Sequence, residues 1–194
     1  MNVQIIRTER LFDGFFKLDR AHLQHETPTG EMSPELMRLN LERGDGAAVL
    51  LVNRDKHTVV LTRQFRYATW LRGDGGWMLE IPAGTVPKGK TPASVARSEL
   101  LEEVGYRPAR LRKLFTFYST PGTTTERTHL FYGEVDSRHK ISAGGGLDSE
   151  HEFIEVVELP VTHALRMLAN GRLADGKTII ALQWLASGRR RGSQ

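Results

Sequence analysis

Three glutamates close together, followed by a glycine, are the residues most able to do chemistry. Glu99, Glu102 and Glu103 lie just before Gly105, and residues three and four apart are neighbours on a helix, so the carboxylates would share one stripe. Like charges at that spacing cost roughly 0.3 kcal/mol per pair, and the C-terminal end of a helix disfavours anions. The pattern therefore favours a site for a hard, oxygen-preferring cation such as Mg²⁺. A solvated acidic face would give the same sequence and stays an alternative.

A second group of acidic residues follows a run of glycines. Asp148, Glu150 and Glu152 come after glycines 144–146, which predict a flexible loop that closes over a substrate. A polar loop that runs into a strand is the alternative interpretation. Arg66 follows an apolar strand, where its planar guanidinium either clamps a phosphate or ends the strand in solvent.

Composition narrows the class of protein. The chain has 194 residues with 39% hydrophobic content, which suits one domain or one domain with a small appendage. It has no cysteine, so disulfides and thiolate metal sites are excluded. The start of the sequence lacks the apolar core of a signal peptide, and no run reaches the ~18 apolar residues of a membrane helix. We therefore expect a cytoplasmic protein with no membrane partner.

The basic charge does not by itself predict a nucleic-acid partner. The formal net charge is +4 and the pI is about 9.6, but much of the excess lies in a tail at residues 189–191. Both signs are mixed elsewhere, and no aromatic-basic RNA-binding box is present. We expect a small-molecule substrate and no nucleic acid, whereas processing of capped RNA is an alternative that depends on the pI alone.

The first 43 residues predict a three-stranded antiparallel sheet. Segments 3–12, 15–26 and 32–44 alternate apolar and polar residues over much of their length, and a turn at 27–30 separates the last two. Three short strands are marginal alone. We therefore expect this N-terminal unit, residues 1–43, to lean on the main domain, residues 44–194, or on a second subunit.

The main domain predicts an α+β fold, because strands are interrupted by one central helix and two helices end the chain. The central helix begins at Thr91-Pro92 and ends at Gly105. Its sheet-facing side is predicted to carry Ala93, Ala96, Leu100 and Val104. Strands are predicted at 47–52, 58–70, 77–83, 111–120, 128–136 and 152–160, and the final helices at 161–171 and 177–188.

The stretch from Gly84 to Tyr106 resembles the box of the Nudix hydrolases. That box reads G-x5-E-x7-R-E-U-x-E-E-x-G-U, where U is apolar, and its matching positions here are Gly84, Glu99, Leu100, Glu102, Glu103, Gly105 and Tyr106. Two positions depart from it: Lys90 replaces the first family glutamate, and Ser98 replaces the family arginine. In the family these two side chains commonly pair with each other, so losing both leaves neither partner stranded.

The resemblance implies a Nudix fold, in which a mixed β-sheet is sandwiched between helices, here with an N-terminal antiparallel β-sheet. The implied metal ligands are Glu99, Glu103, the supporting Glu102 and the carbonyl of Ala83. The implied catalytic residues are Glu152 as first choice, Glu150 as second choice and Glu102. The implied substrate-binding residues are Arg66, Arg38, Glu126 and Gly84.

The resemblance covers nearly the whole chain and involves two related branches. Likeness to ADP-ribose pyrophosphatases is carried by GFFKLDR, ERGDGAAVLL and YSTPGTTTERTHLFYGEVD, and likeness to GDP-mannose pyrophosphatases by RQFRYATW and AGGGLDSEHEFIEVVELP. Both branches imply hydrolysis of a nucleoside diphosphate sugar with Mg²⁺ (or Mn²⁺), in a homodimer whose N-terminal sheets cross to the partner. ADP-ribose, giving AMP and ribose 5-phosphate, is the first substrate predicted, and GDP-mannose is the alternative. A binding module without catalysis is a third hypothesis, which Lys90 and Ser98 motivate.

Overall fold

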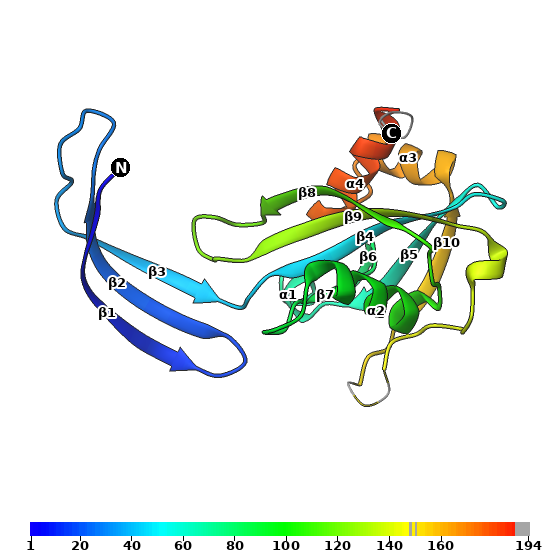
Figure 1. Ribbon diagram of the computed structural model, residues 1–194, viewed down its shortest axis with the longest axis horizontal. Helices are drawn as coiled ribbons and strands as arrows, with labels where there is room; N and C mark the ends of the chain where they lie inside the picture. The colour runs from blue at the N-terminus through cyan, green and yellow to red at the C-terminus, as the bar shows by residue number, and fades with distance from the viewer. Residues whose placement is uncertain (148, 150, 189–194) are drawn as a thin grey trace. The chain divides into compact units, whose positions relative to one another are not determined.

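The computed structural model describes residues 1–147, 149 and 151–188, and the chain divides into two compact units (Figure 1). Unit 1 comprises Met1–Asp45 and Tyr118–Arg127, and unit 2 comprises Gly46–Phe117 and Thr128–Gln194. Among the helices of the described residues, none combines the length and the apolar character needed to cross a membrane.

The elements are named in chain order. They are β1 Val3–Asp13, β2 Lys17–His25, β3 Leu36–Glu42, β4 Gly46–Asn53, β5 Thr58–Phe65, α1 Tyr67–Leu71, β6 Trp77–Glu80, β7 Ala83–Thr85, α2 Pro92–Val104, β8 Leu111–Tyr118, β9 Arg127–Val135, the 3-10 turn η1 Ser137–His139, β10 Glu155–Pro160, α3 Val161–Ala169 and α4 Gly176–Ala186.

Unit 1 is built on the antiparallel sheet β1-β2-β3, which confirms the predicted three-stranded arrangement. Its register pairs Phe12 with Leu18, and Leu18 with Leu41. Every residue of β1 is exposed, whereas most of β2 is half-buried. Ion pairs between Arg10 and Asp19 and between Arg20 and Glu9 join β1 to β2 across this surface. The sheet therefore depends on edge-to-edge pairing more than on a buried core.

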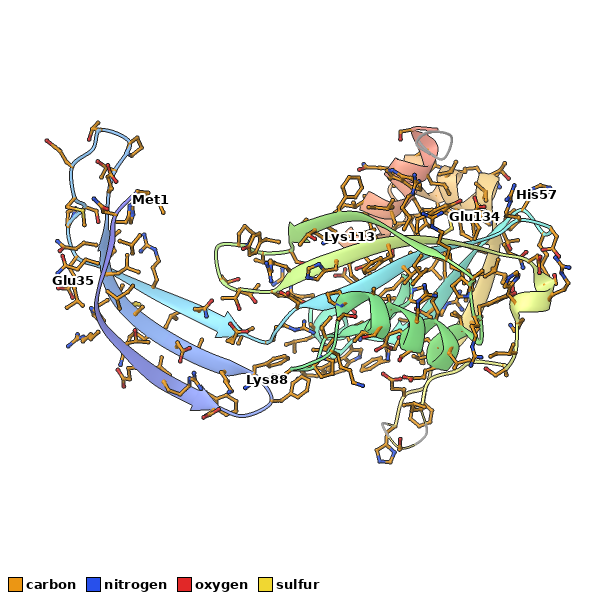
Figure 2. The ribbon with its side chains drawn as sticks, in the orientation of Figure 1. Met1, Glu35, His57, Lys88, Lys113 and Glu134 are labelled. Carbon is orange, nitrogen blue, oxygen red and sulfur yellow. The ribbon has the colours of Figure 1, made fainter. Side chains whose placement is uncertain are left out.

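Unit 2 contains a seven-stranded mixed sheet in the order β10-β5-β4-β9-β8, with β6 paired to β5 and β7 paired to β4. The central strand β4 is parallel to β9 and antiparallel to β5. Because both faces of β4 are covered, its residues from Ala47 to Asn53 are all buried. Figure 2 labels Lys88, in the loop between β7 and α2, and also His57, between β4 and β5, and Glu134, near the end of β9.

Helices cover both faces of the unit 2 sheet, as the predicted α+β sandwich requires (Figure 1). One apolar cluster joins Leu50 and Leu61 to α3 and α4. The other joins Val49 and Leu51 to α2. The alternation of β4 side chains between the two clusters follows the period of two of a strand.

Two predicted strands end earlier in the structure than in the sequence interpretation. Residues 58–70 were predicted as one strand, but β5 ends at Phe65 and Tyr67–Leu71 form the short helix α1. The predicted strand 77–83 breaks at Ile81 and Pro82, after which the chain changes partner from β5 to β4. Proline has no N–H to continue a ladder, which accounts for the break.

Candidate active site

The helix α2 begins and ends at the residues predicted from the sequence. Thr91 is the N-cap: its hydroxyl accepts a hydrogen bond from the Ser94 N–H at 3.1 Å, and the Ser94 hydroxyl accepts one from the Thr91 N–H at 3.2 Å. Gly105 ends the helix in the left-handed region, with φ of 72°, a conformation that glycine adopts without strain. Both ends of the helix that carries the glutamates are therefore fixed locally.

The buried face of α2 includes the predicted Ala96, Leu100 and Val104, and it also includes a glutamate. Ala93 is exposed, so its predicted place against the sheet is wrong, and Val95 is buried instead. Glu103 lies seven residues, about two turns, after the fully buried Ala96 and is therefore on the same side of the helix. Apolar spacing did not place Glu103 on the buried face because its side chain is charged.

Glu103 is the most deeply buried of the three helix carboxylates, with 3% of its surface exposed. One carboxylate oxygen, Oε2, accepts a hydrogen bond from the Ala83 N–H at 3.0 Å. Burial, and next the charge of Glu99, raises the pKa of the Glu103 carboxyl to about 9, and the charge of Glu152 adds to the effect. A group with this pKa holds its proton near neutral pH until a cation approaches.

Glu99 lies over the loop that precedes α2. A Cβ placed on Gly84 would come within 1.8 Å of Glu99 Oε1 and 2.2 Å of its Cδ. An alanine at Gly84 would therefore displace the half-buried Glu99 carboxylate from its place against the backbone of β7. Ala83, whose carbonyl is a predicted ligand, immediately precedes Gly84 and pairs with Ala48 of β4.

The end of α2 also contacts the glycine run predicted to be a flexible loop. The Gly145 N–H donates to the Glu103 carbonyl at 2.9 Å, and the Gly146 N–H donates to the carbonyl of the half-buried Glu102 at 3.1 Å. The helix end thus holds these glycines through backbone hydrogen bonds, a role that the prediction of a flexible loop did not include.

The loop carboxylates are only partly described. Glu152 is half-buried, and its charge acts on Glu103. Asp148 and Glu150 lie outside the described residues. The structure therefore brings Glu152 together with Glu99, Glu103 and the Ala83 backbone, while the choice between Glu152 and Glu150 as the catalytic carboxylate stays a prediction.

Arg66 makes a two-pronged ion pair that the sequence did not suggest. Its Nε and Nη2 donate to the two oxygens of Glu80 at 2.9 and 2.8 Å, and the Glu80 hydrogen bonds raise the pKa of Arg66. Lys177 Nζ lies 3.5 Å from Glu80 and 2.7 Å from Asp175. Arg66 is still 41% exposed, so a phosphate could reach its outer side. The sequence could have indicated this pair, because Glu80 is a charged residue within an otherwise apolar strand.

Two predicted substrate-binding residues belong to unit 1. Arg38 is exposed on β3, and its Nη1 donates to the Met37 carbonyl at 2.9 Å. Glu126 pairs with Arg43 at 3.5 Å. Their predicted roles toward a substrate stay predictions.

The two departures from the Nudix box both lie on the surface. Lys90 and Ser98 are exposed, and the Lys90 N–H closes a turn onto the Pro87 carbonyl at 3.1 Å. Neither side chain is buried, and the coupled loss of the family pair stays a prediction.

The donor set at this helix end suits a divalent metal ion by its chemistry. Carboxylate and carbonyl oxygens are the ligands that Mg²⁺ prefers. Burial and neighbouring carboxylates disfavour the ionised form of Glu103, and a bound cation would stabilise that form. Within the described residues, no three His, Asp or Glu side chains already stand in the geometry of a metal site. The fit therefore concerns ligand type and burial, and it requires side-chain adjustment on binding.

Comparison with known proteins agrees with this arrangement of strand, loop and acidic helix. The NUDIX domain family matches residues 42–182. A GDP-mannose pyrophosphatase of Citrobacter koseri is 40% identical over 186 residues, 95% of this chain and 95% of the relative. GDP-mannose pyrophosphatases of Pectobacterium atrosepticum and Escherichia coli are each 39% identical, over 96% and 94% of this chain and 98% and 94% of their own lengths.

The fold and the acidic helix end thus define a hydrolase that acts on phosphoric anhydrides. The chain belongs to the Nudix family. Members of this family generally need a divalent metal ion.

Proposed function

We propose that the protein hydrolyses the diphosphate bond of GDP-mannose to GMP and mannose 1-phosphate, with Mg²⁺ or Mn²⁺ as cofactor. The relatives named GDP-mannose pyrophosphatase, which align over almost the whole chain, support this substrate. Sequence resemblance alone ranked ADP-ribose first; the relatives reverse that order, and ADP-ribose becomes the competing substrate.

The observation that carries the proposal is the burial of Glu103 beside other carboxylates. The raised pKa of Glu103 reflects burial and the neighbouring Glu99, and its carboxyl group accepts a hydrogen bond from the Ala83 backbone. Ionising a buried carboxyl group beside other carboxylates is costly, and perturbed groups of this kind concentrate at functional sites. A divalent ion would convert this unfavourable cluster into a binding site for a diphosphate.

The site residues would have separate roles in metal binding, proton transfer and substrate orientation. When bound, the metal ion supplies positive charge that neutralises phosphoryl oxygens and acidifies water. Glu99, Glu103 and the Ala83 carbonyl would hold it, with Glu102 in support, and Glu103 would give up its proton to do so. The Glu152 carboxylate would accept the proton of the attacking water, with Glu150 as second choice. Residues proposed to orient the substrate are Arg66, Gly84, Arg38 and Glu126.

The substrate is tested by incubating the protein with GDP-mannose or ADP-ribose and Mg²⁺, then separating the nucleotides. We expect GMP from GDP-mannose, with kcat/KM about tenfold or more above that for ADP-ribose, a ratio that base and sugar contacts commonly give. Omission of Mg²⁺ with added chelator should abolish turnover. Turnover of neither substrate would contradict the proposal, and a reversed ratio would return ADP-ribose to first place.

We also propose that the protein is a homodimer whose N-terminal sheets contact the partner. Unit 1 exposes large apolar side chains, including Phe15 at 86%, Phe12 at 59% and Ile5 at 55%, and exposed apolar patches commonly mark protein interfaces. Light scattering coupled to gel filtration should give twice the mass of the 21.8 kDa chain. Replacement of Phe12 and Ile5 by lysine should shift the mass toward the monomer, and a monomeric parent protein would contradict the proposal.

A further inference from the structure

The last carbonyls of α2 are satisfied in two different ways. A helix leaves its final four carbonyls without intrahelical partners. The N–H of Gly105 contacts Leu101, and that of Tyr106 contacts Leu100, as in a common helix ending. The carbonyls of Glu102 and Glu103 instead accept the N–H groups of Gly146 and Gly145, about forty residues further along the chain. The two carbonyls that need a distant partner thus belong to two of the glutamates at the site.

The glycine run has positive φ throughout, and at Gly144 it lies so close to this helix end that a side chain would not fit. Glycines 144, 145 and 146 have φ of 76°, 113° and 86°, values in the left-handed region that glycine favours. A Cβ on Gly144 would lie 2.6 Å from the Glu103 carbonyl oxygen and 2.7 Å from the Val104 backbone. The segment therefore packs backbone against backbone at the end of α2.

The same segment also holds the loop carboxylate. A Cβ on Gly146 would lie 2.7 Å from the Glu152 Cβ and 2.9 Å from its Oε2. The Gly145 carbonyl accepts the Ile154 N–H at 3.2 Å, and Ile154 is buried. Gly145 and Gly146 thus contact the carbonyls of α2 on one side, and Ile154 and Glu152 on the other.

We propose that Gly146, supported by Gly145, is a positioning residue that fixes the Glu152 carboxylate against the carboxylate end of α2. This inference rests on the proposed function, in which Glu152 acts on the attacking water. Gly146 contributes a backbone N–H to the helix and the empty space that the Glu152 side chain fills. The glycine run serves as a rigid connection between the two groups of carboxylates, and a one-atom addition at Gly146 should separate them.

The test is a double-mutant cycle of Gly146→Ala and Glu152→Gln, with Gly171→Ala as the matched control. Gly171 also has positive φ, 65°, but a Cβ there would meet nothing within 4 Å, so it reproduces the backbone strain without the contact. Gly146→Ala should lower kcat about tenfold or more, with KM changed less than about threefold, because small misplacements of a reacting group are costly in rate. Gly171→Ala should keep the parent rate and show a similar change in melting temperature.

The background of Glu152→Gln separates positioning from general damage. There, Gly146→Ala should reduce kcat by less than about threefold, because the group it misplaces is already inactive. An equal loss in both backgrounds, no loss in the parent, or a parent-like rate for Glu152→Gln alone would each overturn the proposal.

A crystal structure of the Gly146→Ala protein gives a readout that does not depend on activity. Glu152 should be displaced from its place beside α2, whereas Gly171→Ala should leave it there. An unmoved Glu152 would overturn the inference. If the parent protein cleaves no nucleoside diphosphate sugar, the proposed function fails, and this structure alone then decides whether Gly146 positions Glu152.

Discussion

Two buried glutamates in unit 2 lie in opposite electrostatic surroundings. Glu80 and Glu103 are 4% and 3% exposed. Glu80 receives both prongs of Arg66 and lies 3.5 Å from Lys177. Glu103 receives one N–H from Ala83, and the charges of Glu99 and Glu152 raise its pKa more than the charge of Arg66 lowers it. The chain neutralises one buried carboxylate from within and leaves the other for a cation from outside.

The contrast separates a structural role from a functional one. A buried charge that is paired and hydrogen-bonded is compatible with stability, whereas one facing like charges is retained against stability. Where local arrangement conflicts with stability, a functional site is the usual reason. Substitutions at the two positions should therefore have opposite effects on folding and unequal effects on turnover.

The largest expected effect is on catalysis at Glu103. Glu103→Gln keeps an acceptor for the Ala83 N–H but removes the negative charge a metal ion requires, so kcat on the nucleotide sugar should fall by at least about 100-fold. Steady-state kinetics at saturating Mg²⁺ measures this. Arg63→Gln, which alters a surface ion pair on β5, is the control that should keep the parent rate, and a Glu103→Gln rate within twofold of the parent would refute the metal assignment.

The next effect is a difference in sign between the two glutamates in stability. Glu80→Gln leaves Arg66 and Lys177 without their shared counter-charge, and should lower the free energy of unfolding by about 1–3 kcal/mol, since Arg66 is partly solvated. Glu103→Gln in metal-free protein near pH 8 should raise it. Urea denaturation with chelator present gives both values, and shifts of the same sign would remove the comparison on which the account depends.

A third prediction concerns pH in the metal-free protein. The pKa of Glu103 is raised in the folded state from 4.5 to about 9, so the folded protein binds the extra proton between those values and stability falls as pH rises through that window. The slope attributable to Glu103 is at most about 1.4 kcal/mol per pH unit. Glu103→Gln should flatten it, whereas Glu80→Gln should preserve the Glu103 contribution. A parent slope identical to that of Glu103→Gln would show that burial does not raise the pKa.

The smallest expected effect is at the surface pair that joins β5 to β10. Arg63 Nη1 lies 3.1 Å from Glu155, and both side chains are about half exposed, at 47% and 58%. Such pairs contribute little, so Arg63→Gln should change the free energy of unfolding by less than about 0.5 kcal/mol. A larger loss in the same urea experiment would mean that exposed pairs in this sheet matter as much as the buried Arg66–Glu80 pair.

Local sequence signals predicted the frame of the site well, because they act over a few residues. Thr91 and Gly105 end α2 where capping chemistry and positive φ place them. The α+β class and the N-terminal sheet follow from hydrophobic periodicity in the same way, whereas resemblance to the Nudix family implied the sandwich of a mixed sheet between helices. Three of the four residues predicted to face the sheet from α2 are buried, but Glu103 occupies a core position that apolar spacing cannot reveal.

Contacts between distant segments could not be predicted from the sequence. Glu80 meets Lys177 from almost one hundred residues away, and Gly145 meets the Glu103 carbonyl across about forty. Nothing in either local stretch specifies its partner, because the pairing arises from tertiary packing. The residues that support the site are for this reason harder to find than the carboxylates themselves.

The most direct test of the central claim is anomalous diffraction from crystals soaked in Mn²⁺ with a non-hydrolysable nucleotide-sugar analogue. We expect a manganese peak beside the Glu99 and Glu103 carboxylates and the Ala83 carbonyl, and we expect that peak to be lost in Glu103→Gln crystals. Water alone at that helix end, or a peak unaffected by Glu103→Gln, would contradict this claim.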